Sequence, residues 1–215
     1  MTDKRIKNEQ WTVKELISKI NNKEISKPKF QRKRKWDILP KNANNPNEKA
    51  YITFLYDTEN SVHAITFGQE TILRKSNIDG NNRINAIKHF MDKPFEIYPD
   101  YLDKLFNYCN NNLDLSQTDK NTLINIFNNL SYTEIMNFKY NLYFVHNGHE
   151  TLYPKIQKYR DFIGDILIEE LQTKLKIRGS ENFDSNVKIN VNLFEGYTTD
   201  ELCKTFEDIK KYNSK

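Results

Sequence analysis

The stretch that decides the fold is residues 78–90, Ile-Asp-Gly-Asn-Asn-Arg-Ile-Asn-Ala-Ile-Lys-His-Phe. After its glycine, apolar residues recur at helical spacing at Ile84, Ile87 and Phe90, which predicts a strand, a tight turn and an amphipathic helix. A glycine turn that opens a helix presents unpaired main-chain N–H groups and the positive end of the helix dipole. The stretch therefore predicts a phosphate site, and the alternative is a plain strand-to-helix turn.

Five consecutive residues of this turn form the candidate site. Gly80, Asn81 and Asn82 would offer main-chain N–H groups to a phosphate, and the guanidinium of Arg83 could bind the same anion. Asp79 could position Mg²⁺ or a water molecule beside a nucleoside triphosphate, so Asp79 and Arg83 are the candidate catalytic residues. The alternative for Asp79 is a turn residue that hydrogen-bonds its own backbone. Three other carboxylates could assist it: Asp57, Glu59 and Glu70.

A second notable stretch is the basic segment, residues 28–36, Pro-Lys-Phe-Gln-Arg-Lys-Arg-Lys-Trp. Cations beside aromatic rings can bind phosphates and stack a nucleic-acid base. The alternative is a surface loop that Phe30 and Trp36 anchor to the core. The candidate nucleic-acid-binding residues of this segment are Gln31, Arg32, Lys33, Arg34 and Lys35.

Charge is distributed unevenly along the chain. Residues 1–93 hold 19 Lys and Arg against 11 Asp and Glu, a net charge of +8, whereas residues 94–215 hold 14 against 18, a net charge of −4. The basic part contains both stretches described above, which favours an anionic partner, DNA or a nucleotide. The 28 Asn and 26 Lys against 7 Arg are typical of an AT-rich genome, so the few arginines are the more informative residues.

Composition also indicates the class of protein. With 215 residues, 37% of them hydrophobic and 13% aromatic, the chain can bury a core. No apolar run approaches the roughly 20 residues that span a bilayer, and no signal peptide precedes the first predicted helix. Cys109 and Cys203 are isolated thiols. We therefore expect an intracellular, cytoplasmic protein without a membrane partner. His146 and His149 have no supporting Cys or carboxylate pair, so no metal site is predicted there.

Hydrophobic periodicity predicts an α+β fold. A polar tail precedes a helix over 12–22, which begins with a capping box of Thr12 and Glu15, and an extended link follows at 24–26. The further expected elements are a helix from Pro46, strands over 62–68 and 70–75, the helix after Gly80, helices over 100–109, 118–130 and 132–140, a strand over 141–145, a long helix over 153–176, a strand over 187–193, and a last helix capped at Thr198. We expect one domain over 1–215, made of a motif-bearing core (11–93), a mainly helical elaboration (94–183), and a returning strand with a terminal helix (184–215).

The motifs resemble those of the ParB/sulfiredoxin-like fold. Residues 80–86, Gly-Asn-Asn-Arg-Ile-Asn-Ala, fit its G-x-x-R-x-x-A pattern, in which a strand, turn and helix hold a nucleotide phosphate. Closer still is the similarity to the family of domain of unknown function 262, the N-terminal domain of GmrSD-type restriction systems. Its Asp-Gly-Gln-Gln-Arg signature resembles residues 79–83. Three further parts match in order, at 11–16, 28–36 and 187–213.

The resemblance implies a core of a small mixed sheet with packed helices, in a nucleotide- or phosphate-binding domain that acts on DNA or senses it. It also implies Mg²⁺ and a nucleoside triphosphate as cofactors, NTPase or nuclease activity, and a protein partner that supplies an effector domain. Two departures favour the alternative, a non-catalytic DNA-binding or structural protein that keeps the fold. Both glutamines of the signature are the shorter Asn81 and Asn82 here, and no His-Asn-His nuclease segment is present. A large DNA virus with an AT-rich genome would be a natural source of such a protein, and the virion a natural location. Sulfiredoxin chemistry is excluded because no Cys stands at position 81 or 82.

Overall fold

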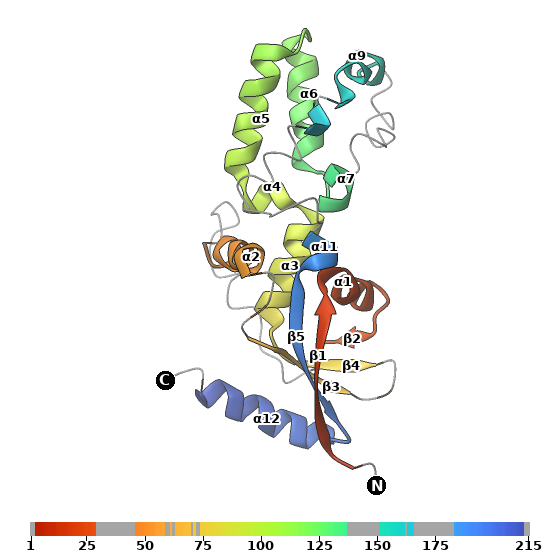
Figure 1. Ribbon diagram of the computed structural model, residues 1–215, viewed down its shortest axis with the longest axis vertical. Helices are drawn as coiled ribbons and strands as arrows, with labels where there is room; N and C mark the ends of the chain where they lie inside the picture. The colour runs from red at the N-terminus through yellow and green to blue at the C-terminus, as the bar shows by residue number, and fades with distance from the viewer. Residues whose placement is uncertain are drawn as a thin grey trace. The chain divides into compact units, whose positions relative to one another are not determined.

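The chain folds into an α+β structure with a mixed five-stranded sheet and packed helices, as the sequence predicts (Figure 1). It divides into two compact units: unit 1 comprises Met1–Ala43, Ala50–Ile87 and Gly179–Lys215, and unit 2 comprises Asn44–Lys49 and Lys88–Arg178. The organisation as a single domain over 1–215 with a core, a helical elaboration and a returning segment stays a prediction. The computed structural model describes residues 3–28, 46–58, 61, 63–69, 71, 74–136, 151–161, 163–165 and 183–212.

The sheet of unit 1 has the strand order β1-β5-β3-β4-β2. Its central strand β3 pairs parallel with β5 and antiparallel with β4. The edge strand β1 pairs antiparallel with β5, and the short edge strand β2 pairs parallel with β4. The strands are β1 (Arg5–Thr12), β2 (Ile25–Ser26), β3 (Ile65–Gln69), β4 (Lys75–Asp79) and β5 (Lys188–Glu195).

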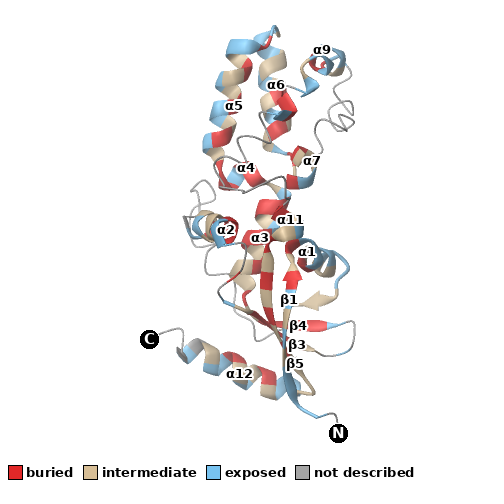
Figure 2. Cartoon of the chain, viewed as in Figure 1, coloured by how far each residue is buried: buried red, intermediate tan, exposed pale blue. Residues whose placement is uncertain are grey.

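The C-terminal strand and helix are as predicted. Ile189, Val191 and Leu193 of β5 are buried and alternate with half-buried polar residues, which is the period-two pattern of a strand with one face in the core (Figure 2). The helix α12 (Thr199–Tyr212) follows, and Thr198 Oγ1 accepts a hydrogen bond from the main-chain N–H of Glu201 at 3.4 Å. Local patterns therefore determine this part of the fold.

The N-terminal segment forms the strand β1 and not the polar tail that the sequence predicts. It pairs with β5 along its whole length. Most of its side chains are polar, and its Ile6 is 51% exposed, so the hydrophobic alternation that indicates a strand is missing. Trp11 is its one buried side chain and stacks on Phe67 of β3 with 5.3 Å between ring centroids. Pairing with β5 keeps this segment in the sheet, and the residues of the segment itself do not indicate that pairing.

The strand before the candidate site begins at Lys75, where the predicted strand, 70–75, ends. The main-chain N–H of Arg74 instead donates to Thr71 Oγ1 at 3.0 Å, and residues 70, 72 and 73 of the predicted strand lie outside the described residues. Lys75, Ser76 and Asn77 are polar but only 3–6% exposed. The prediction was wrong here because the apolar residues precede the strand and polar residues occupy its buried positions. The other strand, β3, starts at Ile65, later than predicted, and ends one residue later.

The first helix of unit 1 begins at its predicted start signal. The helix α1 (Val13–Asn21) has a complete capping box, because Thr12 Oγ1 accepts from Glu15 N at 3.0 Å and Glu15 Oε2 accepts from Thr12 N at 2.6 Å. In the predicted extended link over 24–26, the carbonyl of Glu24 accepts a hydrogen bond from the main-chain N–H of Lys75 at 2.8 Å. The other helices with residues in this unit are α2 (Pro46–Thr58), α3 (Asn81–Asp92) and α11 (Phe183–Asn186).

The terminal helix α12 packs against the strand that leads into the candidate site. Its Leu202 and Phe206 form a buried cluster with Ile78 of β4. Gly68 of β3 faces Leu202 so closely that a Cβ at this position would overlap the leucine side chain. The end of the chain therefore supports the strand that ends at Asp79.

Unit 2 is mainly helical in the part of the chain that the structure describes. Its α5 and α6 lie side by side (Figure 1). Phe90 lies 6.0 Å from Tyr98 and 5.6 Å from Tyr132, between ring centroids, in a buried aromatic cluster. No helix within the described ranges combines the length and apolar character required to cross a membrane. The helices are α4 (Pro94–Ile97), α5 (Pro99–Asn112), α6 (Gln117–Asn128), α7 (Tyr132–Met136) and α9 (Tyr153–Gln157).

Predictions for unit 2 have mixed outcomes. The capping box before α7 is confirmed, because Ser131 N donates to Glu134 Oε2 at 2.8 Å and Glu134 N donates to Ser131 Oγ at 3.3 Å. The helix predicted over 153–176 is wrong in its first part, because a turn at residues 158–159 ends α9. The end of the helix predicted over 132–140 and the whole strand predicted over 141–145 lie outside the described residues.

A hydrogen-bonded cluster joins the first turn of α2, the end of α3 and α4. His89 Nδ1 lies 2.8 Å from Glu48 Oε2, and His89 Nε2 lies 3.0 Å from Glu96 Oε2. Lys93 Nζ donates to Glu96 Oε1 at 2.6 Å. Only the imidazolium form of the histidine can donate to both carboxylates at once. Burial alone would raise the pKa of Glu96, but the hydrogen bonds from Lys93 and His89 outweigh burial and lower it.

Candidate functional site

The candidate site is the turn between β4 and α3. Asp79 is the last residue of β4, and Gly80 follows with φ at +103°, a conformation that L residues rarely adopt. A Cβ at Gly80 would lie 2.9 Å from Ile65 Cγ2. Both the backbone conformation and the neighbouring strand therefore require glycine. The carbonyl of Gly80 accepts the first helical hydrogen bond of α3, from Ile84 N at 2.9 Å.

The guanidinium of Arg83 is bound by the protein itself. Its Nη2 donates to Asp79 Oδ2 at 2.7 Å. Its Nη1 donates to the main-chain carbonyls of His63 at 2.7 Å and Ala64 at 3.1 Å. The Arg83 side chain is only 16% exposed. One cation therefore ties the first turn of α3 to the end of β4 and to the residues just before β3.

The same ion pair engages the carboxylate of Asp79, the candidate metal- or water-positioning residue. Asp79 is 30% exposed, and one of its oxygens accepts from Arg83. A carboxylate that already holds a guanidinium can bind Mg²⁺ or orient water only through its other oxygen or after the pair separates. The structure thus brings the two candidate catalytic residues together, as partners of each other.

The two asparagines of the signature form the first turn of α3 and are half-buried. The first N–H groups of a helix have no partner within the helix and can bind an anion. The Nδ2 amide of Asn81 is buried and has no hydrogen-bond acceptor among the residues that the structure describes. A buried donor without an acceptor is unfavourable by about 1–3 kcal/mol, so an anion that accepted this hydrogen bond would gain affinity.

Tyr51 of α2 lies near Arg83 at this site, and the sequence patterns do not single it out. Burial raises the pKa of Tyr51 to about 12, against the opposing effect of the nearby Arg83 cation. The tyrosine therefore stays protonated and neutral at physiological pH. No local pattern indicates its place, because it belongs to a different helix, well before the turn in the sequence.

The other candidate residues divide between the described and undescribed parts of the chain. Asp57 lies exposed near the end of α2. The remaining candidates lie outside the described residues: Gln31, Arg32, Lys33, Arg34 and Lys35 of the basic segment, the carboxylates Glu59 and Glu70, and the pair His146 and His149. Their assignment stays a prediction from the sequence.

Within the described ranges, no three His, Cys, Asp or Glu side chains come together as a metal-binding group. Both cysteines are free thiols. Cys109 is buried in α5, and burial raises its pKa to about 12, so its thiol stays protonated.

The structure is that of an α+β protein in which a turn at Gly80 connects a strand to a helix. The ion pair between Asp79 and Arg83 joins the two sides of this turn. No protein-family model matches the chain, and neither a curated protein nor a solved structure shows significant similarity to it. The resemblance to the ParB/sulfiredoxin-like fold therefore rests on the order of the sequence motifs and stays a prediction.

Proposed function

We propose that the protein is a DNA-binding domain of ParB-like type that binds backbone phosphate and does not hydrolyse nucleotides. In this proposal a phosphate lies against the main-chain N–H groups at the start of α3 and accepts from the Nδ2 amide of Asn81. The basic segment binds neighbouring phosphates along the same strand.

The ion pair between Asp79 and Arg83 is the observation that carries the proposal. Phosphoryl transfer requires a group that holds metal or water and a cation that neutralises the developing charge. The turn supplies one residue of each kind, and they are 2.7 Å apart and bound to each other. The two carbonyl groups that Arg83 also binds fix it further. We infer that these residues shape the turn and that the amide groups bind the phosphate.

Charge supports DNA as the partner. The net charge of +8 over residues 1–93 includes the turn and the basic segment, and a basic surface attracts the phosphate backbone without regard to sequence. The family resemblance also points to DNA. Its NTPase and nuclease functions would require Asp79 either to act through its other carboxylate oxygen or to separate from Arg83.

The test measures DNA binding and nucleotide hydrolysis on the same preparations of the whole chain. Fluorescence anisotropy with a labelled duplex, over a range of salt concentrations, gives the affinity and, from its salt dependence, how many phosphates the protein neutralises. Phosphate release is measured with Mg²⁺ and each of the four nucleoside triphosphates. We expect salt-dependent DNA binding and no phosphate release above the level of a buffer blank.

Two double substitutions test whether the basic segment, and not positive charge elsewhere on the chain, accounts for DNA binding. Arg32→Ala/Arg34→Ala should weaken binding and lower the salt slope by about 1 for each phosphate that the variant no longer neutralises. The control Arg160→Ala/Lys88→Ala removes the same charge from exposed positions of unit 2 and should leave the slope unchanged. Phosphate release that Asp79→Asn abolishes would establish the enzymatic alternative, and salt-independent DNA binding would contradict the proposal.

A further inference from the structure

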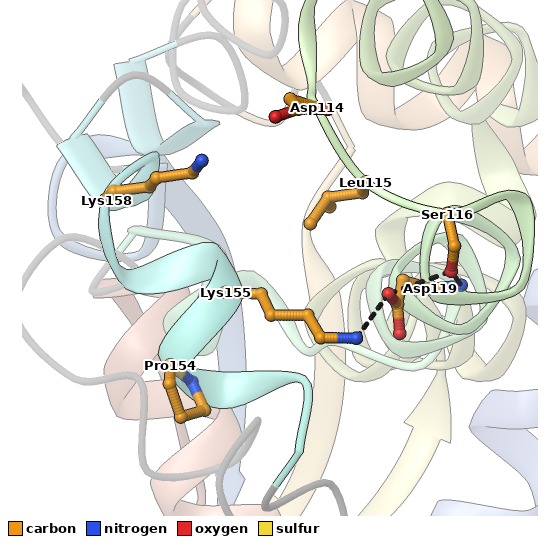
Figure 3. A pocket seen from close by; sticks show the side chains of 7 residues that line it. All are labelled: Asp114, Leu115, Ser116, Asp119, Pro154, Lys155 and Lys158. Carbon is orange, nitrogen blue, oxygen red and sulfur yellow. Dashed lines mark hydrogen bonds and ion pairs between the residues drawn. The ribbon is translucent and has the colours of Figure 1, made fainter.

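Unit 2 contains a pocket of about 420 Å³ that lies apart from the β4–α3 turn in the sequence (Figure 3). One wall is the loop before α6 with the first turn of that helix, and the other is α9 with the turn after it. This volume lies within the range of small-molecule sites, about 300–1,000 Å³. The lining residues are Asp114, Leu115, Ser116, Asp119, Pro154, Lys155 and Lys158.

One ion pair in the pocket is complete and joins its walls. Lys155 Nζ lies 2.6 Å from Asp119 Oδ2, and Ser116 Oγ donates to the same carboxylate oxygen at 2.8 Å (Figure 3). The hydrogen bonds from Lys155 and Ser116 lower the pKa of Asp119, so this carboxylate is ionised at neutral pH. A second link joins the walls, because the main-chain N–H of Asp114 donates to the hydroxyl of Tyr159 at 3.1 Å. These two contacts therefore link the two walls of the pocket directly.

Two further charged side chains, both exposed, line the pocket. The ammonium of Lys158 and the carboxylate of Asp114 come from opposite walls, and neither makes an ion pair with any residue that the structure describes. Lys158 Nζ lies 4.7 Å from the centroid of the Tyr159 ring, a cation–π contact with the neighbouring residue. The pocket thus presents one positive and one negative group to the same space.

We propose that this pocket binds a free α-amino acid with an apolar side chain. The carboxylate of the ligand would pair with Lys158 and its ammonium with Asp114. The side chain would lie on Leu115 and Pro154, the apolar residues of the lining. A ligand that carries both charges would pair with both Lys158 and Asp114, whereas a simple anion or a simple cation would pair with only one of them.

Calorimetric titration of the whole chain with L-leucine, L-methionine and L-valine tests the proposal. We expect saturable binding of at least one of them with a Kd of about 1 mM or tighter. N-acetyl-L-leucine lacks the ammonium and L-leucinamide lacks the carboxylate, and each should bind at least about tenfold more weakly than L-leucine. These comparisons use the unaltered protein and do not depend on how well any variant folds.

Substitutions then assign the two contacts. Asp114→Asn and Lys158→Gln should each weaken binding of the amino acid at least about tenfold, whereas the controls Asp103→Asn and Lys88→Gln, at exposed positions of the same unit, should not. Far-UV circular dichroism checks that all four variants fold. The proposal is overturned if none of the three amino acids binds saturably, or if N-acetyl-L-leucine or acetate binds as tightly as L-leucine.

Discussion

Removal of the Arg83 side chain should destabilise unit 1 strongly, because that side chain holds three parts of the unit together. Hydrogen bonds to charged groups contribute about 1.5–3 kcal/mol each, and Arg83 makes three of them. The contributions do not add, since Asp79 is 30% exposed and can regain water. We therefore expect Arg83→Met to lower the free energy of unfolding by about 2–4 kcal/mol. Arg83→Lys keeps the charge but not the planar fork, and should lower it by about half as much.

Urea titration followed by tryptophan fluorescence measures this effect in the correct part of the molecule. The chain has two tryptophans, and both lie in the sequence of unit 1, at Trp11 and Trp36. The fluorescence transition therefore reports unit 1 even if the two units unfold separately.

A matched control comes from Arg160, which is 44% exposed in unit 2 and pairs only with its neighbour Asp161 among the described residues. Arg160→Met should change the fluorescence transition by less than about 0.5 kcal/mol. A decrease of less than about 1 kcal/mol in the free energy of unfolding of Arg83→Met would contradict this structural role. Such a result would mean that the guanidinium contributes little to the fold and is kept for another purpose, which would favour a role in binding or catalysis.

Substitutions at three other positions test separate features of the fold. Gly80→Ala should lower the free energy of unfolding of unit 1 by about 2–4 kcal/mol in the same urea titration. The φ angle of Gly80 is strained for alanine, and the added Cβ would overlap the Ile65 side chain. A decrease below about 1 kcal/mol would contradict this expectation. Thr12→Ala removes the capping box of α1 and should cost about 1 kcal/mol in that assay, whereas Thr12→Ser should keep most of the stability; equal decreases would refute the capping role. Burial alone would raise the pKa of Glu96, but its hydrogen bonds with Lys93 and His89 lower it below the ordinary value of 4.5. The ionised Glu96 therefore stabilises the fold above about pH 4.5, and this contribution is lost as the pH falls through the lower pKa of the folded state. Glu96→Gln should reduce this acid dependence in circular dichroism melts, and an identical dependence in both proteins would rule out the contribution.

The elements that sequence patterns predict correctly are those with a local cause. The alternation in β5 and the capping boxes of α1 and α7 involve residues only two or three positions apart. The strand β1 was missed because its cause is not local: its polar residues pair with β5, which lies near the other end of the sequence. The strand β4 was misplaced because buried positions are filled by polar residues there.

The candidate site shows the same limit. The glycine turn and the start of α3 could be predicted, because a glycine before an apolar helical pattern is a local signal. The partnership of Asp79 and Arg83 does not follow from helical spacing, because Asp79 is the last residue of β4 whereas Arg83 lies in α3. The carbonyl groups of His63 and Ala64 could not be predicted either, because they reach Arg83 through the packing of β3 against β4. Through these hydrogen bonds Arg83 stabilises the fold of unit 1.

The most direct test of the proposed function follows the main-chain amide signals of residues 80–82 by ¹⁵N NMR while the whole chain is titrated with a short DNA duplex. The account predicts that these signals, together with the Nδ2 signal of Asn81, shift saturably with DNA and return when salt is added. Signals that do not move while anisotropy shows the DNA to be bound would contradict it. In that case phosphate binding would lie elsewhere on the chain.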